Sequence, residues 1–343
     1  MTDLPLTARV FDALVQAPSH GGWRPFQSGA LIAATLGVTR GAVWKAADHL
    51  RSLGVPVEAL PRQGYRLAMD CTALSRQAIL DALPGTLRSS LRSGDCAWQL
   101  ASTNASLLAQ GALQPGQWDF LTAEVQTAGR GRRGRSWLAP PGAALCLSWS
   151  WCFEALPAQA GALGLAIGVT ALRALANLGV TGVQLKWPND LVTAQGKLGG
   201  ILIEMRTEAG GPVHVVCGIG LNLSLPQAIR EAIAATGNQA TDLASLDCPL
   251  PGRSALAAGL LHQGVIGLGV FGREGLAPFH PAFTAADALV GRPVVAQGAT
   301  SQRVGQACGI DPDGALLLQT REGLQRVFSA DVSVRPASAA GGE

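Results

Sequence analysis

The chain has 343 residues, of which 48% are hydrophobic and 14% are charged, and its net charge is +3. This length exceeds a single domain of about 100 to 200 residues, and the composition excludes a broadly disordered protein. The small net charge does not indicate nucleic-acid binding by itself, so that function depends on where the charges lie.

The N-terminal segment, residues 1–15, lacks the long apolar run and the cleavage site of a signal peptide. The seven cysteines are scattered and never form a CxxC motif, which indicates neither a disulfide framework nor a zinc knuckle. We therefore expect a reduced, cytoplasmic protein.

Residues 1–68 are predicted to form an N-terminal domain. Helices are expected at residues 6–16, 28–36 and 39–53, with a Gly-Val turn between the second and the third. This is the pattern of a helix-turn-helix motif. A small helical domain that serves only packing or dimerisation is the alternative interpretation.

The third of these helices carries the candidate DNA contacts. Its apolar residues fall on one face, which leaves Arg40 and Lys45 available to a groove of DNA. Two short alternating segments, residues 55–59 and 64–67, predict a two-stranded wing on which Arg62 would contact phosphate. The domain is therefore predicted to be a winged helix-turn-helix.

Residues 84–286 are expected to form a central domain of alternating short strands and helices. The strands are expected at residues 120–125, 145–151, 183–187, 200–205 and 213–221. This alternation predicts a mixed α/β layer. Helical character is also expected in the linker at residues 72–83 and at residues 259–272, with an irregular connection at residues 276–283.

One apolar segment of this domain, residues 160–180, has the length of a membrane span. Thr170, Arg173 and Asn177 recur in it at helical spacing and form a polar stripe. We therefore expect a mostly buried helix at residues 160–178.

Residues 287–337 are expected to form a small C-terminal β-barrel. Its strands are expected at residues 293–296, 304–310, 315–319 and 325–329. They are joined by Gly298 and by a turn at residues 311–314. The last residues, 337–343, are small or acidic and are expected to fray.

The densest chemical signal is the sequence GRGRRGR at residues 129–135, where four arginines alternate with three glycines. Glycine permits close approach of a ligand to the backbone, and each guanidinium offers a rigid fork of donors to phosphate or carboxylate oxygens. Such a loop can close over an anionic ligand, and the following Trp137 can stack on an adenine. A basic RNA-binding patch and a solvated loop without a role are the alternatives.

A second motif, KWPNDL at residues 186–191, precedes KLGGILIE at residues 197–204. The proline ends one strand and the Asn-Asp pair suits a turn, so strand, tight turn, strand is the predicted geometry. Lys197 enters an apolar strand, where it can counter a carboxylate or a charged phosphoryl transition state. An exposed turn and a surface lysine at the start of a strand are the alternatives.

Two weaker motifs complete the set. Ser102, Thr103 and Asn104 precede a helix expected at residues 105–110, where they can also serve only as an N-cap. The sequence GIGLNL at residues 218–223 has glycines that allow something to pack close to a strand, although such glycines often mark a bulge. No GxxxxGK[ST] motif occurs, which excludes a P-loop, and the five histidines do not cluster, so covalent catalysis is not predicted.

In this order, the motifs STN, EVQTAGRGRRGRSW, KWPNDL, KLGGILIE and GIGLNLS resemble those of the biotin protein ligases. The N-terminal helix-turn-helix makes the chain similar to the bifunctional, repressor-type members. The resemblance implies an α/β (α+β) central domain of the biotin/lipoate ligase type and an SH3-like C-terminal barrel. It also implies biotin, ATP and Mg²⁺ as ligands, operator DNA as a partner, repression of biotin biosynthesis and a homodimer.

The implied reaction has two steps. Biotin and MgATP give biotinyl-5'-AMP and pyrophosphate, and a lysine of the biotin carboxyl carrier protein of acetyl-CoA carboxylase then attacks the mixed anhydride. A regulator that uses biotinyl-AMP only as a corepressor is the alternative. Lipoate ligase is the nearest enzymatic competitor, and the sequence GRGRRGR argues against it.

The resemblance also implies roles for single residues. The residues implied to bind biotin are Ser102, Thr103, Asn104, Gln126, Arg130, Gly131, Arg132 and Lys197. The residues implied to bind ATP are Trp137, Lys186, Asn189, Asp190 and Asn222, with Mg²⁺ near Asp190. Lys197 and Arg132 are the implied catalytic residues.

The sequence departs from this family at two positions. Ala101 stands where an acidic residue is expected before STN, and Cys308 stands where repressor-type members carry arginine. We therefore expect the C-terminal domain to contribute less directly to ATP binding here.

Overall fold

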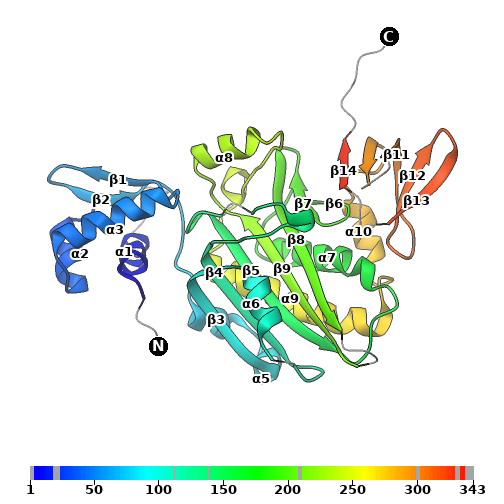
Figure 1. Cartoon of the computed structure of the whole chain (residues 1–343), viewed down its shortest axis with the longest axis horizontal. Helices are drawn as coiled ribbons and strands as arrows, with labels where there is room; N and C mark the ends of the chain where they lie inside the picture. Colours follow the sequence, from blue (N-terminus) through cyan, green and yellow to red (C-terminus); the bar gives the residue numbers. More distant parts are fainter. Residues whose placement is uncertain are drawn as a thin grey trace, which may run out of the picture.

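The computed structural model describes residues 4–17, 24–111, 113–137, 139–207, 211–298, 302–328 and 333–336, the last four as backbone. Three units follow one another along the chain, from helices at one end of the molecule to small strands at the other (Figure 1). The predicted frayed segment at residues 337–343 and the last residue of the strand predicted at 325–329 lie outside the described residues.

The N-terminal unit is a winged helix-turn-helix, as predicted. It consists of α1 (Leu6–Val15), α2 (Gly29–Leu36), α3 (Arg40–Ser52), β1 (Val57–Leu60) and β2 (Gly64–Leu67). The side chains of Ser28 and Thr39 cap α2 and α3, and Gly37 ends α2 with a φ of 67°. Gly37 and the Thr39 cap fix the turn between α2 and α3, and β1 pairs antiparallel with β2 to form the wing.

The central unit is a mixed seven-stranded sheet in the order β3-β4-β5-β9-β8-β7-β6. Its strands are β3 (Leu91–Leu100), β4 (Trp118–Gln126), β5 (Ala144–Phe153), β6 (Gln184–Lys186), β7 (Asp190–Thr193), β8 (Gly196–Thr207) and β9 (Val213–Asn222). The pair β3 and β4 is parallel and the other neighbours are antiparallel. The five predicted strands are confirmed with shifted ends, and β3 and β7 are additional. The edge strand β3 has no clear apolar alternation, so its sequence gives no strand signal.

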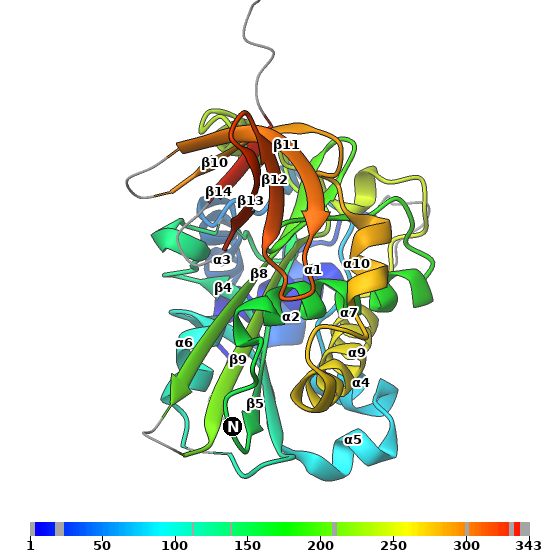
Figure 2. The same ribbon diagram turned by 90° about the vertical axis from the view of Figure 1, so that its right-hand side faces the viewer.

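Helices cover both faces of this sheet (Figure 2). The short α6 (Thr103–Ala109) lies on one face, and α7 (Leu163–Asn177) and α9 (Arg253–Glu274) pack against each other on the opposite face. The segment Ala160–Asn177 and α9 are long and apolar enough to cross a membrane by length and composition, but most of each is buried within the fold. Both are therefore helices of the core, as predicted for the first. The shorter helices are α4 (Arg76–Ala82), α5 (Gly85–Ser90) and α8 (Gln227–Ala234).

The irregular connection predicted at residues 276–283 is wrong, because α10 (His280–Ala286) begins inside it. Pro281 lies in the first turn of α10. A proline is tolerated there because the first N–H groups of a helix have no intrahelical partner to lose.

The C-terminal unit is a five-stranded antiparallel sheet in the order β13-β12-β11-β10-β14. Its strands are β10 (Pro293–Gln297), β11 (Gln302–Ile310), β12 (Leu316–Thr320), β13 (Gly323–Val327) and β14 (Ser333–Pro336). The turn between β11 and β12 docks on the central unit, where Trp187 Nε1 donates a hydrogen bond to the carbonyl of Gly314 over 3.1 Å. The predicted small C-terminal β domain is confirmed. This hydrogen bond attaches it to the central unit at the end of β6.

Two hydrophobic cores hold these units together. The larger joins the sheet, α7 and α9 with apolar residues of the C-terminal strands, among them Val294 and Leu316. The smaller fills the helix-turn-helix and includes Ala143 and Leu225 from the central unit. The N-terminal unit is therefore packed against the central unit as well as linked to it, and the rings of Phe11 and Trp98 lie 5.6 Å apart across that contact.

Candidate functional site

The sequence motifs converge over the middle strands of the large sheet. The STN residues begin α6, Gln126 ends β4, and Lys197 lies near the start of β8. Asn222 ends β9, and the hairpin of β6 and β7 carries the KWPND motif. Residues more than 100 positions apart in sequence thus lie around one part of the sheet.

The STN residues are buried and form a hydrogen-bond network rather than a simple cap. Ser102 caps α6 by accepting from the N–H of Ala105. The backbone N–H and the hydroxyl of Thr103 lie 2.8 and 3.2 Å from Oε1 of Gln126, which accepts from both. The structure therefore brings the STN residues into contact with Gln126, which lies just before the arginine loop in the sequence.

Two further members of this network were not predicted as site residues. The hydroxyl of Ser148, on β5, lies 2.7 Å from Oγ1 of Thr103 and 2.6 Å from Oδ1 of Asn104. The carboxylate of Glu204, on β8, accepts from Nδ2 of Asn104 over 2.8 Å. These contacts fix both ends of the Asn104 amide, so its donor and acceptor face defined directions. A serine in the middle of the apolar strand CLSWSW is the sequence signal for Ser148.

The glycines of GIGLN allow side chains of the same site to lie on the strand. A Cβ at Gly218 would be 2.2 Å from Oδ1 of Asn104, and a Cβ at Gly220 would be 2.5 Å from the indole of Trp137. Any larger residue would displace these two groups. The prediction of close approach is confirmed, and the groups that approach are the protein's own Asn104 and Trp137.

The arginine loop forms a compact hairpin. The N–H of Gly131 donates to the carbonyl of Arg135 over 2.7 Å, and the N–H of Trp137 donates to Gly129 over 3.0 Å. Arg133 has a φ of 58° and the following Gly134 a φ of 70°, which places two residues in the left-handed region where glycine is favoured. Arg130, Arg133 and Arg135 are exposed, so the hairpin presents cationic side chains to the surface.

One contact joins the arginine loop to the KWPND hairpin. Nη1 of Arg132 donates to Oδ1 of Asn189 over 3.3 Å, and Nδ2 of Asn189 donates to the carbonyl of Ile201 over 2.7 Å. Asn189 thereby anchors Arg132 to the sheet.

Lys197 lies beside this contact. Its ammonium group forms an ion pair of 2.6 Å with the carboxylate of Asp190, and it lies close above Gly200, where a Cβ would be 3.2 Å from Nζ. Lys186 is the cross-strand neighbour of Asp190 in the β6–β7 hairpin. The structure therefore gathers cations and one carboxylate where the start of β7 pairs with Gly200 of β8.

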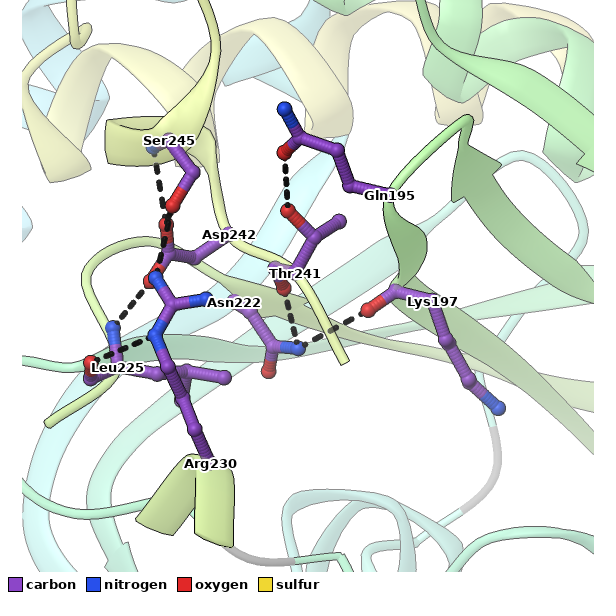
Figure 3. Close-up of polar contacts among 8 residues, drawn as sticks. All are labelled: Gln195, Lys197, Asn222, Leu225, Arg230, Thr241, Asp242 and Ser245. Atoms are coloured by element: carbon purple, nitrogen blue, oxygen red, sulfur yellow. Dashed lines mark hydrogen bonds and ion pairs between the residues drawn. The ribbon is translucent and has the colours of Figure 1, made fainter. Parts of the chain in front are cut away.

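Asn222 is buried, and its side chain binds the backbone (Figure 3). Its Nδ2 donates to the carbonyl of Thr241 over 2.9 Å and lies 3.4 Å from the carbonyl of Lys197. The backbone of Lys197 also pairs with Gln239 and Thr241. Asn222 thus helps to hold the strand position from which Lys197 projects.

The same segment is tied to α8 by Asp242. This buried carboxylate accepts from the side chain of Arg230, on α8, and caps the turn at Ser245 (Figure 3). The N–H of Leu225 donates to it as well. Sequence reasoning missed this cluster, because an Asp in a polar connection and an Arg on an amphipathic helix give no signal on their own.

A buried ion pair lies between the site and the N-terminal unit. Arg253, on α9, forms a bidentate pair with Glu124, on β4, over 2.6 and 2.7 Å, and its Nε donates to the carbonyl of Thr72 in the linker. Glu124 also accepts from the N–H of Gly142. The pair therefore connects the linker, the sheet and the segment after the arginine loop.

The thiol of Cys146 lies beneath the site but is not suited to nucleophilic chemistry. Complete burial raises its pKa to about 12, against a smaller opposing effect of a hydrogen bond with Gln126. It stays protonated at neutral pH, and a thiol is a far weaker nucleophile than a thiolate.

The predicted DNA contacts lie apart from this site, on the N-terminal unit. Arg40 and Lys45 are exposed on the first half of α3, and Arg62 is exposed in the turn of the wing with a φ of 66°. Cys308 is exposed on β11, and Ala101 is exposed before α6.

Comparison with known proteins gives a consistent result over the whole chain. The Biotin/lipoate A/B protein ligase family matches residues 101–222, an HTH domain matches residues 24–66, and the Biotin protein ligase C terminal domain matches residues 289–335.

Two bifunctional ligase/repressors named BirA are similar over most of their length. The protein of Escherichia coli is 36% identical over 313 residues, covering 91% of this chain and 94% of the relative. The protein of Bacillus subtilis is 29% identical, with coverage of 94% and 97%. A biotin protein ligase of Aquifex aeolicus, solved with biotin and ATP, superposes on 72% of this chain with a TM-score of 0.59 and 24% identity, which shows the shared fold.

Proposed function

The chain belongs to the biotin protein ligases of the bifunctional ligase/repressor type, and from this premise we propose how its residues divide the work. The substrates are biotin and ATP, and the acceptor is a lysine of the biotin carboxyl carrier protein of acetyl-CoA carboxylase. A curated relative in Mycobacterium tuberculosis, 38% identical over 197 residues, carries the name biotin–[acetyl-CoA-carboxylase] ligase.

The observation that supports this assignment best is the contact between Arg132 and Asn189 beside Lys197. It places the arginine loop, the KWPND hairpin and the candidate catalytic lysine around one position. An anionic centre held there would be surrounded by preorganised positive charge, which is the largest single source of stabilisation for such transition states.

In the first step the biotin carboxylate attacks the α-phosphorus of ATP. A bond forms between a carboxylate oxygen and that phosphorus, the bond to the bridging oxygen breaks, and pyrophosphate leaves. Lys197 and Arg132 offset the charge on the carboxylate and the phosphoryl oxygens. Arg130 and the backbone of Gly131 cover the same anion from the loop.

In the second step the acceptor amine attacks the acyl carbon of biotinyl-AMP. The carbon–oxygen bond to phosphate breaks, AMP leaves as the anion, and the amine loses its proton. The arginine loop excludes water from the mixed anhydride between the two steps, because hydrolysis would release biotin without transfer.

The network of Ser102, Thr103, Asn104 and Gln126 is the proposed site for the polar ring of biotin. Ser102, Thr103 and Asn104 are buried, and the network is already held by hydrogen bonds, so little ordering is needed when the ligand binds. Trp137, Lys186, Asn189, Asp190 and Asn222 are the proposed ATP-binding residues.

Among the described residues, no group of three or more histidine, cysteine, aspartate or glutamate side chains is arranged to hold a metal ion. We infer that Mg²⁺ arrives with ATP, since this ion is commonly held by phosphates, water and one or two carboxylates. Asp190 would supply the carboxylate, and the ion would neutralise phosphate charge.

We also propose that the helix-turn-helix represses biotin biosynthesis genes by binding operator DNA as a homodimer in the cytoplasm. A free edge of β8 supports the pairing of two copies, because β7 pairs with β8 only at Gly196–Gly200. In the described chain, residues 202–207 of β8 have no strand on that side. An exposed edge of this kind can add a strand from a second copy.

Biotin-dependent exchange between ATP and labelled pyrophosphate tests the enzyme proposal. It isolates the first step from the carrier protein and from DNA. Exchange with biotin and not with lipoate is expected. Exchange with neither acid in folded protein would contradict the proposal and favour the regulator that uses biotinyl-AMP only as a corepressor.

The DNA proposal has a separate test. Arg40→Ala and Lys45→Ala should weaken DNA binding and lower its dependence on salt, because fewer phosphate contacts release fewer counterions. Unchanged affinity and salt dependence in both variants would contradict the assignment of these residues.

A further inference from the structure

The recognition helix α3 carries a large apolar side chain that the fold does not bury. Trp44 is 55% exposed, whereas the apolar residues that pack α3 into the domain are buried: Val43, Ala46, Ala47 and Leu50. Trp44 therefore belongs to the solvent face of the helix and has no part in the core of the unit.

The surroundings of Trp44 match a surface for DNA. Arg40 precedes it by four residues and lies on the same side of α3, and Lys45 follows it directly. Gly41 is exposed on that face, and a Cβ there would have only a distant contact of 3.9 Å with Thr39. Packing therefore does not require glycine at position 41, and its lack of a side chain leaves room for something to approach Trp44.

The distribution of charge along α3 also favours its N-terminal half as the surface for DNA. The first two turns contain Arg40 and Lys45 and no acidic residue, and Asp48 follows in the third turn, near Arg51. In a helix-turn-helix the N-terminal residues of the second helix contact base edges. The indole of Trp44 occupies that part of the helix.

We propose that Trp44 reads the 5-methyl group of a thymine in the major groove, with Arg40 and Lys45 on the flanking phosphates. The proposal rests on the DNA binding proposed above. Thymine alone presents a methyl group in this groove, and apolar side chains contact it. An indole offers a wide apolar surface for that contact and a single N–H donor at its edge.

The test uses DNA that the protein itself selects. A random duplex library is enriched with the full chain in the presence of biotin and MgATP. Each thymine of the selected site is then replaced by deoxyuridine, which lacks only the methyl group. Binding is measured with wild type, Trp44→Ala, Trp44→Phe and, as a matched control, Leu31→Ala, which removes another exposed apolar side chain from the same unit.

In the wild type we expect one deoxyuridine position per half-site to weaken binding by about fourfold, the effect of losing one buried methyl-sized group. Trp44→Ala should bind the selected site roughly 30-fold more weakly and should lose the response to deoxyuridine at that position. Trp44→Phe and Leu31→Ala should retain the response. Circular dichroism and thermal unfolding confirm that each variant is folded.

Other outcomes overturn the proposal in distinguishable ways. An unchanged deoxyuridine response in folded Trp44→Ala would show that a different residue reads the methyl group. A variant that binds DNA like the wild type but changes the sedimentation mass would assign Trp44 to a contact between protein copies. If the wild type enriches no sequence at all, both this inference and the proposed repressor function fail.

Discussion

The ammonium group of Lys197 lies 2.6 Å from the carboxylate of Asp190, so the proposed catalytic cation already has an acidic neighbour before substrates bind. Both side chains are partly exposed, which means that a substrate anion can reach Lys197 and that Mg²⁺ can reach Asp190. The pair keeps the ammonium group in place over Gly200, where the absence of a side chain leaves it room.

Lys197→Ala should reduce biotin-dependent pyrophosphate exchange by about 10²- to 10³-fold, mainly in kcat, because it removes a donor to the charge that develops in the transition state. The biotin KM should change less. Exchange kinetics at saturating ATP measure both constants. A kcat within a few-fold of the wild type would remove Lys197 from the catalytic role.

Ser148→Ala should raise the biotin KM by about tenfold and leave the ATP KM unchanged. The hydroxyl holds Thr103 and Asn104 in place, and loss of a buried hydrogen-bond partner costs about 1–3 kcal/mol. Ser150→Ala is the matched control, since Ser150 is buried on the same strand but faces Asp119. Equal changes of the biotin KM in both variants would mean that the strand, and not the network, was disturbed.

Arg253→Met should destabilise the folded chain by about 3–5 kcal/mol, because it leaves the buried Glu124 carboxylate without its partner. The double variant Glu124→Gln, Arg253→Met removes both charges and should be more stable than Arg253→Met alone. Urea unfolding monitored by fluorescence compares the three proteins. A double variant less stable than the single one would show that the pair does not act as a unit.

Asp12→Asn should stabilise the chain at pH 7 and have little effect near pH 3. Burial, with the nearby charge of Glu124, raises the pKa of the Asp12 carboxyl in the folded state. Because the pKa of Asp12 is raised in the folded state, the ionised carboxylate destabilises the folded chain at pH values above that pKa. This destabilisation disappears below about pH 4, where the carboxyl group is protonated in both the folded and the unfolded state. Melting temperatures of the wild type and Asp12→Asn between pH 3 and pH 7 test this prediction. A stabilisation by Asp12→Asn that grows as the pH falls would contradict it.

Cys308→Arg should lower the ATP KM by up to about tenfold, the effect of one added charge-assisted hydrogen bond, whereas Cys308→Ala should leave it unchanged. The position is exposed on β11, so a longer side chain can be accommodated. Steady-state exchange at varied ATP measures the effect. Equal ATP KM values for the two variants would show that this position does not reach the nucleotide.

Much of the site could be predicted because its motifs are short stretches of sequence whose residue types suit one chemistry. The arginine loop, the KWPND hairpin and the STN residues are of this kind. Ser148, Glu204 and Asp242 could not be predicted, because each is a single polar residue whose role depends on a partner more than 10 positions away. Only the pairing of distant strands and helices reveals such a partner.

The fold was predictable where apolar residues recur at regular spacing, including the helix expected at residues 259–272 despite its glycines, and less so at residues 276–283 around Pro281. Glycines inside α9 serve packing: a Cβ at Gly264 would be 2.5 Å from Trp149, and one at Gly267 would be 2.4 Å from Thr170. The helix continues through them because its neighbours fill the space. Pro281 likewise begins α10 instead of interrupting a segment.

The shared core of the central and C-terminal units has a consequence for cooperativity. Val294 and Leu316 belong to the same apolar cluster as Leu165 of α7, and the bond from Trp187 to Gly314 crosses the same junction. A chain cut after α10 would expose this cluster to water and leave a buried indole N–H without an acceptor. Strands β10 to β14 are therefore expected to melt together with the central sheet, in one transition, and to have no independent unfolding step.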